Sequence, residues 1–229
     1  MSEILIVVPA RGGSKRVPRK NITPLGGMPL LEWTLIAAKR GLPQTRLIVS
    51  TEDDEIARLT NDLGVQVIKR PVDLATDIAS TEGVLLHVID SVASDSVTPD
   101  WVMCLPPSSP FRSPDTIAKV AQHAGQDDLI DCYFTVTESR GDFWRPAADG
   151  VWRRMEADAP RRQQDREPLY EENSAIYLTR ISALRQTNFI MGSCAVGIPI
   201  DQVEATDINT PKDIQFANAL ITAGLARTP

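Results

Sequence analysis

The sequence predicts an α/β fold built on a mostly parallel, doubly wound sheet with a small inserted element. Two observations support this prediction: short apolar runs alternate with amphipathic helical segments through the first half of the chain, and the connections between them are short. Alternating elements of this kind require a parallel sheet covered by helices on both faces, with ligands at the carboxyl ends of its strands.

Each expected element follows from its local residues. Apolar, β-branched runs predict strands over residues 3–8, 46–50, 65–68 and 101–105. Apolar residues at helical spacing predict helices over residues 29–40 and 53–63. Ser80 or Thr81 can cap a third helix that runs to about Val92, and Pro114 opens a fourth that ends near Gly125.

The pattern changes over residues 142–172. This stretch holds Trp144, Trp152, scattered glycine and proline, and a charged run at residues 161–167. We interpret it as an insertion within a single domain that spans residues 1–229, because this length suits one α/β domain.

Charge and apolar content limit the possible functions. The formal net charge of −6 argues against a general nucleic-acid binder, whose affinity depends on neutralising phosphates over a wide surface. No signal-peptide pattern and no apolar stretch of membrane-spanning length is found, so we expect a cytoplasmic protein that does not bind a membrane. Cys104, Cys132 and Cys194 lack the spacing of a zinc site or a disulfide framework, so buried, reduced thiols are expected.

A glycine-bearing, cation-rich loop follows the first expected strand. Gly12 and Gly13 let the backbone turn tightly and bring its N–H groups close to a ligand, and five of the residues between positions 11 and 20 are lysine or arginine. This pattern predicts a polyphosphate site, with a solvated basic turn as the alternative. Neither the Walker pattern nor G-x-G-x-x-G is present, so ATPase and dinucleotide chemistry are not expected.

Five motifs follow one another along nearly the whole chain. They are P-A-R-G-G-S-K with P-R-K-N (residues 9–15 and 18–21), R-P-x-x-L-A-x-D-x-A-S-T (70–81), L-P-P-S-S-P-F-R (105–112), Y-E-E-N-S-A-I-Y (170–177) and D-I-N-T (207–210). Together they resemble the motifs of the acylneuraminate cytidylyltransferases, the CMP-sialic acid synthetases and their relatives.

The resemblance implies a reaction and a setting for it. The fold would be that of the nucleotide-diphospho-sugar transferases. The anomeric hydroxyl of a nine-carbon sugar acid would attack the α-phosphate of CTP, and pyrophosphate would leave, with Mg²⁺ as the hard cation. In that family the region equivalent to residues 142–172 dimerises and reaches the neighbouring subunit's site, so a homodimer is expected by analogy.

The resemblance also implies which residues contact the nucleotide. Arg11, Lys15 and Lys20 would bind the triphosphate, with Arg11 and Lys20 taking part in catalysis, while Arg16 and Arg19 can face solvent. Asn21 would face the cytosine or ribose, unless it only forms a turn. The expected nucleotide contacts are Ala10, Arg11, Gly12, Gly13, Ser14, Lys15, Asn21, Arg70 and Thr81.

Asp207 is the expected catalytic metal ligand. The family has two carboxylates two residues apart that bind magnesium, and here Asn209 takes the second place. An amide oxygen can coordinate a hard cation but brings no charge, which leaves the number of ions open. The alternative role for Asp207 is to cap a helix that begins near Pro211.

The sugar-acid contacts implied by the resemblance are Asn173 and Tyr177, with Arg162 (or Gln163 in its place) for the carboxylate. Pro106 stands where the sialate enzymes have a substrate-contacting glutamine. This departure favours another nonulosonic acid, such as legionaminic, pseudaminic or a deaminated acid, and eight-carbon sugar acids and phosphonates stay open.

Two other classes of function are alternatives to this one. A nucleotide-sugar glycosyltransferase predicts Asp-x-Asp after a central strand, where this chain has Cys104-Leu105-Pro106-Pro107. A module that binds nucleotide without turnover is kept open by Pro106 and Asn209.

Overall fold

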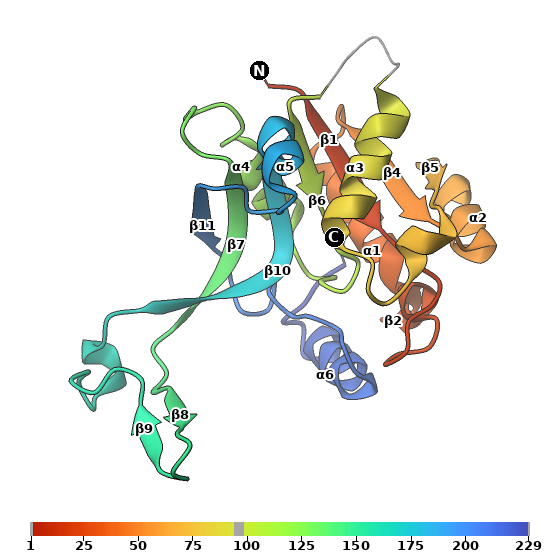
Figure 1. Ribbon diagram of the computed structural model, residues 1–229. Coiled ribbons are helices and arrows are strands. Elements are labelled where there is room, and N and C mark those ends of the chain that lie inside the picture. The colour runs from red at the N-terminus through yellow and green to blue at the C-terminus, as the bar shows by residue number, and fades with distance from the viewer. Residues whose placement is uncertain (1, 94–98, 229) are drawn as a thin grey trace.

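The computed structural model describes residues 2–93 and 99–228. Its centre is a seven-stranded sheet in the order β11-β7-β10-β6-β1-β4-β5 (Figure 1). In chain order these strands are β1 (Ile4–Pro9), β4 (Arg46–Thr51), β5 (Gln66–Lys69), β6 (Trp101–Cys104), β7 (Cys132–Ser139), β10 (Leu169–Arg180) and β11 (Ala195–Pro199). Two further pairs of short strands are β2 (Pro24–Leu25) with β3 (Met28–Pro29), and β8 (Trp144–Pro146) with β9 (Trp152–Arg154).

The large sheet is mostly parallel, as the sequence predicts. β1 pairs in parallel with β4 on one side and β6 on the other, β4 pairs in parallel with β5, and β7 with β11. β10 runs antiparallel to both β6 and β7. Among the seven strands described, β10 is therefore the one that is reversed.

The expected helices form with small shifts at their ends, and α5 is an additional helix that the sequence analysis did not predict. The α-helices are α1 (Leu30–Gly41), α2 (Asp54–Asp62), α3 (Thr81–Val92), α4 (Pro114–Ala121), α5 (Ile181–Thr187) and α6 (Pro211–Thr222). Short 3₁₀ turns form at η1 (Lys20–Ile22), η2 (Val72–Ala75) and η3 (Gln163–Asp165). α4 ends at Ala121, short of Gly125, because the chain from residue 122 to 126 forms turns.

Alternating side chains of β1 pack into two separate cores. Ile6 and Val8 join the core beneath α1 and α4, and Leu5 and Val7 join the core beneath α3 and α5. The two helix layers cover opposite faces of the sheet (Figure 1). This burial on both faces explains why the strand is apolar throughout, and it holds the loop that follows the strand in a fixed place.

Two helix caps settle alternatives that the sequence left open. Ser80 caps α3, since its hydroxyl accepts a 3.1 Å hydrogen bond from the Gly83 N–H, and Thr81 is the first helical residue. Thr210 caps α6 in a capping box with Asp213. The alternative roles of Thr81 and Asp207 as N-caps are therefore wrong.

A long arm extends from the body of the molecule. β7 and β10 continue past the sheet as a two-stranded ribbon that carries β8 and β9 at its tip (Figure 1). Asp142 links two segments of the arm, because its carboxylate accepts hydrogen bonds from Arg154 at 2.6 Å and from Arg166 at 3.2 Å. Residues 142–172, the expected insertion, make up most of this arm.

No helix in the described parts of the chain is both long and apolar enough to cross a membrane.

Candidate active site

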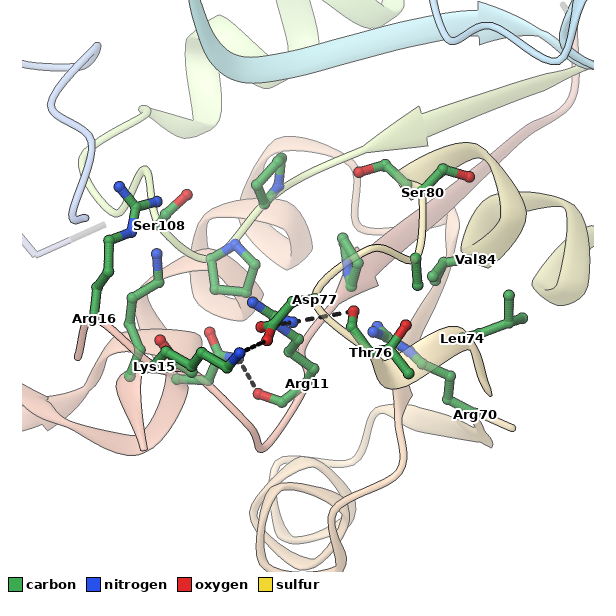
Figure 2. A pocket seen from close by; sticks show the side chains of 18 of the residues that line it. Arg11, Lys15, Arg16, Arg70, Leu74, Thr76, Asp77, Ser80, Val84 and Ser108 are labelled. Carbon is green, nitrogen blue, oxygen red and sulfur yellow. Dashed lines mark hydrogen bonds and ion pairs between the residues drawn. The ribbon is translucent and has the colours of Figure 1, made fainter. Parts of the chain in front are cut away.

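A cleft of about 460 Å³, here called the main cleft, opens at the carboxyl edge of the sheet. It lies at the carboxyl ends of β1 and β6. The strand order reverses between these two strands, and open α/β sheets bind their ligands at such a topological switch point. Its walls hold the cations and amides of the first loop, the segment after β5 and the turn after β6 (Figure 2). They include Arg11, Ser14, Lys15, Arg16, Lys20, Asn21, Arg70, Asp77, Thr81, Pro106 and Asn209.

Asn21 closes the loop of residues 10–20. Its amide nitrogen donates a 2.8 Å hydrogen bond to the Arg11 carbonyl, and only 6% of the residue is exposed. The bond holds Arg11 at the end of β1, so Asn21 lines the main cleft and also organises the loop that forms it.

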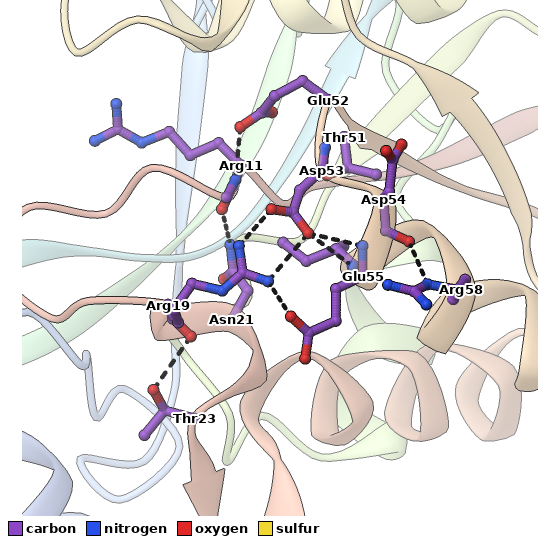
Figure 3. Close-up of polar contacts among 12 residues, drawn as sticks. Arg11, Arg19, Asn21, Thr23, Thr51, Glu52, Asp53, Asp54, Glu55 and Arg58 are labelled. Carbon is purple, nitrogen blue, oxygen red and sulfur yellow. Dashed lines mark hydrogen bonds and ion pairs between the residues drawn. The ribbon is translucent and has the colours of Figure 1, made fainter.

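Acidic residues after β4 support the same loop from outside the main cleft (Figure 3). The Gly12 N–H donates to Glu52 at 2.7 Å, and a Cβ at Gly12 would lie only 2.5 Å from a carboxylate oxygen of Asp53. This close approach explains the glycine at position 12. Arg19 pairs with Asp53 and Glu55, so it does not line the main cleft.

The Arg19–Asp53 pair also fixes the start of α2. The Asp53 carboxylate caps the helix by accepting from the N–H groups of Glu55 and Ile56 at 2.9 and 3.0 Å. Its hydrogen bond with Arg19 is the main reason that the pKa of Asp53 is held down to about 2.

Lys20 and Arg70 are the poorly solvated cations of the main cleft. Lys20 donates to the Ile208 carbonyl at 2.6 Å, and Arg70 donates to the Ser50 carbonyl at 2.7 Å. Burial lowers the pKa of each, and for Lys20 the charge of Asp207 partly opposes that effect. Neither forms an ion pair with a carboxylate of the described residues, so an anion in the main cleft would stabilise both charges.

Asp207 and Asn209 stand on the border between the main cleft and a second hollow of about 370 Å³, here called the side cleft. The side cleft is lined by Thr137, Glu171, Glu172, Asn173, Ser174, Gln202, Ala205 and Asp207. Asn209 lines the main cleft, where its amide oxygen accepts a 3.0 Å hydrogen bond from Arg16. Its amide nitrogen donates to Oδ2 of Asp207, and Oδ1 of Asp207 is buried without a hydrogen-bond partner.

The buried Oδ1 of Asp207 suits a hard cation. No cluster of three or more His, Cys, Asp or Glu side chains that would enclose a metal is found in the residues described. Mg²⁺ is commonly held by one or two carboxylates together with water and substrate phosphates, so a single carboxylate beside the main cleft fits this ion.

Residues 5–196 match the family model described as cytidylyltransferase. This chain belongs to the cytidylyltransferase family. Along 95% of its length it is 30% identical to the CMP-N,N'-diacetyllegionaminic acid synthase of Legionella pneumophila, of which the alignment covers 96%. It is 28% identical to the pseudaminic acid cytidylyltransferase of Campylobacter jejuni, over 94% of this chain and 95% of that protein.

The fold of this cytidylyltransferase is similar to that of CMP:2-keto-3-deoxy-manno-octonic acid synthetase solved with CTP. The TM-score is 0.70 at 17% identity, covering 97% of this chain and all of the other. The family and the fold class expected from the motifs are thus confirmed. Family membership also favours nucleotidyl transfer over the glycosyltransferase and the binding module.

The expected sugar contacts of the cytidylyltransferase do not meet in one place. Asn173 lines the side cleft, Pro106 lines the main cleft, and Arg162 is exposed on the arm at the start of η3. Tyr177 is 7% exposed, and its hydroxyl donates to Glu172. Burial, helped by that bond, raises the pKa of Tyr177.

Asn173 makes three hydrogen bonds to protein groups. Its oxygen accepts from the Thr135 hydroxyl at 2.6 Å and from the Ala175 N–H at 3.2 Å, and its nitrogen donates to the Thr137 hydroxyl at 2.9 Å. These bonds hold the irregular stretch of β10 in which Ser174 has a φ of 58°. Asn173 therefore shapes the side cleft whether or not it also contacts a ligand.

Arg112, to which the sequence analysis assigns no role, connects the turn after β6 to β10 and to α1. This fully buried side chain donates to the Pro106 carbonyl at 2.7 Å, to the Ala175 carbonyl at 2.5 Å and to the Thr34 hydroxyl at 2.6 Å. Burial lowers its pKa to about 9. The position of Arg112 at the end of the L-P-P-S-S-P-F-R motif was a sequence signal that could have indicated this role.

The cysteines agree only in part with expectation. Cys104 and Cys132 are fully buried, and burial raises the pKa of each thiol to about 12. Cys194 is exposed, so the expectation of a third buried thiol is wrong. It directly precedes β11, which is an edge strand of the sheet and offers less cover.

Proposed function

We propose that this cytidylyltransferase transfers the cytidylyl group of CTP to the anomeric hydroxyl of a nonulosonic acid and releases pyrophosphate. The observation that carries the proposal is the border formed by Asp207 and Asn209. It separates a cation-lined cleft suited to a triphosphate from a side cleft whose carboxylates and hydroxyls suit a polyhydroxylated substrate. Two relatives along nearly the whole chain are named for the nonulosonic acids legionaminic and pseudaminic acid, which supports this substrate class.

The chemical step needs alignment and charge neutralisation. A bond forms between the anomeric oxygen and the α-phosphorus, the bond from that phosphorus to the pyrophosphate oxygen breaks, and the hydroxyl proton passes to water. Arg11, Lys15 and Lys20 would hold the triphosphate, because all three line the main cleft. Mg²⁺ at Asp207, with Asn209 beside it, would neutralise charge on the phosphate oxygens.

A homodimer is the second part of the proposal. The arm exposes large apolar side chains, among them Trp144 at 46% and Trp152 at 61%. A two-stranded hairpin on its own is marginally stable in water, and clustered exposed apolar side chains mark interaction sites. We infer that a second copy covers the arm, and that Arg162, which lies on it, serves the partner's site.

A cytoplasmic location belongs to the same proposal, since the chain would act on CTP and keeps its two buried cysteines as free thiols.

The activity is tested with purified protein, CTP, Mg²⁺ and a panel of sialic, legionaminic, pseudaminic and eight-carbon sugar acids. We expect pyrophosphate release only when a nonulosonic acid is present, with the CMP conjugate identified by mass spectrometry. Release with the eight-carbon acid alone would replace the proposed substrate class. Tight CTP binding without release on any acid would favour a binding module.

The dimer is tested by analytical ultracentrifugation of the wild type and of a variant carrying Trp144→Ser and Trp152→Ser, which we expect to be a monomer. Mixing Arg11→Ala with Arg162→Ala subunits then tests whether Arg162 acts across subunits. A mixed dimer holds one site with an intact Arg11 and the partner's Arg162, so activity should rise above that of either variant alone. No rise in a mixture shown to exchange subunits would contradict the shared site.

A further inference from the structure

The carboxylate of Asp77 forms ion pairs with Arg11 and Lys15, the two outer cations of the main cleft. Asp77 Oδ1 lies 2.9 Å from Arg11 Nη1, and its Oδ2 pairs with Lys15. The Thr76 carbonyl accepts a further 3.1 Å hydrogen bond from the same Arg11 nitrogen. Figure 2 shows Asp77 between these two cations, inside the main cleft. Two of the three side chains proposed to hold the triphosphate are thus already paired with an anionic group.

The inner cations of the main cleft differ in this respect. Lys20 and Arg70 donate to backbone carbonyls and have no ion pair with the described carboxylates. Asp77 therefore neutralises the cations in the outer part of the main cleft, whereas the cations in the inner part can still bind an anion. If the triphosphate lies along the main cleft, Asp77 and the outer phosphates compete for the same partners.

The segment that carries Asp77 is only lightly attached. Residues 71–80 join β5 to α3, and apart from Leu74, Ala75 and Ala79 all of them are exposed. Ile78 is 95% exposed, and the Asp77 side chain is 37% exposed. Segments with little buried apolar surface move at small cost in free energy. The contacts with Arg11 and Lys15 therefore hold the middle of this segment over the main cleft, while its ends are held by buried Arg70 and the α3 cap at Ser80.

We propose that Asp77 is an affinity-setting residue that exchanges places with the outer phosphates: it leaves Arg11 and Lys15 when the triphosphate binds, and it returns to them as pyrophosphate departs. This inference rests on the proposed function for the identity of the ligand. Since breaking the two ion pairs costs free energy, Asp77 weakens the binding of CTP and of pyrophosphate. A ligand without outer phosphates, such as CMP, does not displace Asp77, so its affinity does not depend on this residue.

The exposure of the two ion pairs of Asp77 sets the size of its effect on affinity. Both ion pairs are partly exposed, and each such pair contributes little on its own, so removing Asp77 should tighten pyrophosphate and CTP by roughly fivefold. Because salt screens exposed charges, the gain should shrink as ionic strength rises.

The test measures the dissociation constants of pyrophosphate, CTP and CMP by calorimetry, in Mg²⁺ buffer at low and high salt. The proteins are the wild type, Asp77→Asn, Asp77→Ala and the control Asp73→Asn. Asp73 is an exposed acid on the same segment without an ion pair in the described structure, so it matches the change in net charge. We expect both Asp77 variants to bind pyrophosphate and CTP more tightly at low salt, with CMP unchanged and the control like the wild type.

Unchanged or weaker pyrophosphate binding in both Asp77 variants, with circular dichroism unaltered, would overturn the inference. An equal gain in Asp73→Asn would also overturn it, because a general charge effect would then explain the result. Failure of the proposed function looks different, since it appears as absent turnover with every sugar acid whatever residue occupies position 77.

Discussion

The amide of Asn209 donates a hydrogen bond to Oδ2 of Asp207 and leaves the other oxygen of that carboxylate buried and without a partner. The amide oxygen of Asn209 points the other way and accepts from Arg16. The orientation of this amide is thus set from both sides, and it presents a single free carboxylate oxygen at the border of the two clefts.

Replacing Asn209 with aspartate should strengthen magnesium binding. Two carboxylates would then lie side by side, which is unfavourable without a cation and favourable with one. We expect Asn209→Asp to lower the half-saturating Mg²⁺ concentration several-fold in a titration of turnover, and calorimetry to show tighter Mg²⁺ binding with CTP present. Asn61→Asp, on the exposed face of α2, is the matched control. The same half-saturation in both forms would count against a metal at Asp207.

Arg11→Ala should reduce turnover by about a hundredfold or more, the loss typical when one donor to a developing anion is removed. Arg11 lies at the end of β1, lines the main cleft and is positioned by Asn21. Pyrophosphate release measured at saturating substrate checks this, with exposed Arg58→Ala as the control. A folded Arg11→Ala protein with the wild-type rate would remove Arg11 from the reaction.

The pH dependence of CTP binding should report on Lys20. Burial lowers the pKa of Lys20, so its ammonium loses a proton at lower pH than that of an exposed lysine. The charged form binds phosphate, and affinity should therefore fall as the pH rises through the lowered pKa. For stability the sign is reversed: burying the charged form lowers the free energy of unfolding at neutral pH, and this cost disappears as Lys20 deprotonates.

Lys20→Arg tests this sign, because a guanidinium keeps its charge and should move the loss of CTP affinity to higher pH. Dissociation constants measured from neutral to strongly alkaline pH give the comparison, and exposed Lys212→Arg on α6 serves as the control. An identical alkaline limb in the wild type and Lys20→Arg would assign the titration to another group.

The three cysteines should react in two classes. Cys194 is exposed, whereas Cys104 and Cys132 are buried with raised pKa values. In the native protein we expect one equivalent of thiol to react rapidly with Ellman's reagent, and all three after unfolding. Cys194→Ser should remove the rapid phase, and Cys132→Ser should keep it. A rapid phase that survives in Cys194→Ser would mean that a buried thiol becomes accessible.

Local patterns were enough to predict much of the fold. β1 and β6 are apolar throughout because both faces of the sheet are covered, and the loop after β1 carries its glycines and cations within a few residues. The ends of elements were less predictable. The turns after Ala121 and the choice of Ser80 over Thr81 as a cap depend on which side chain meets which N–H group.

The sequence by itself determined the α/β class, the cation-rich loop and the order of the five motifs, because each depends on residues close together in the chain. Only the tertiary structure decided which cations are free. Arg11 meets Asp77 across 66 positions, the Gly12 N–H meets Glu52 across 40, and Asn209 meets Arg16 across 193. The order of the strands in the sheet decides which residues meet across such long sequence separations. That order cannot be read from the spacing of residues along the chain.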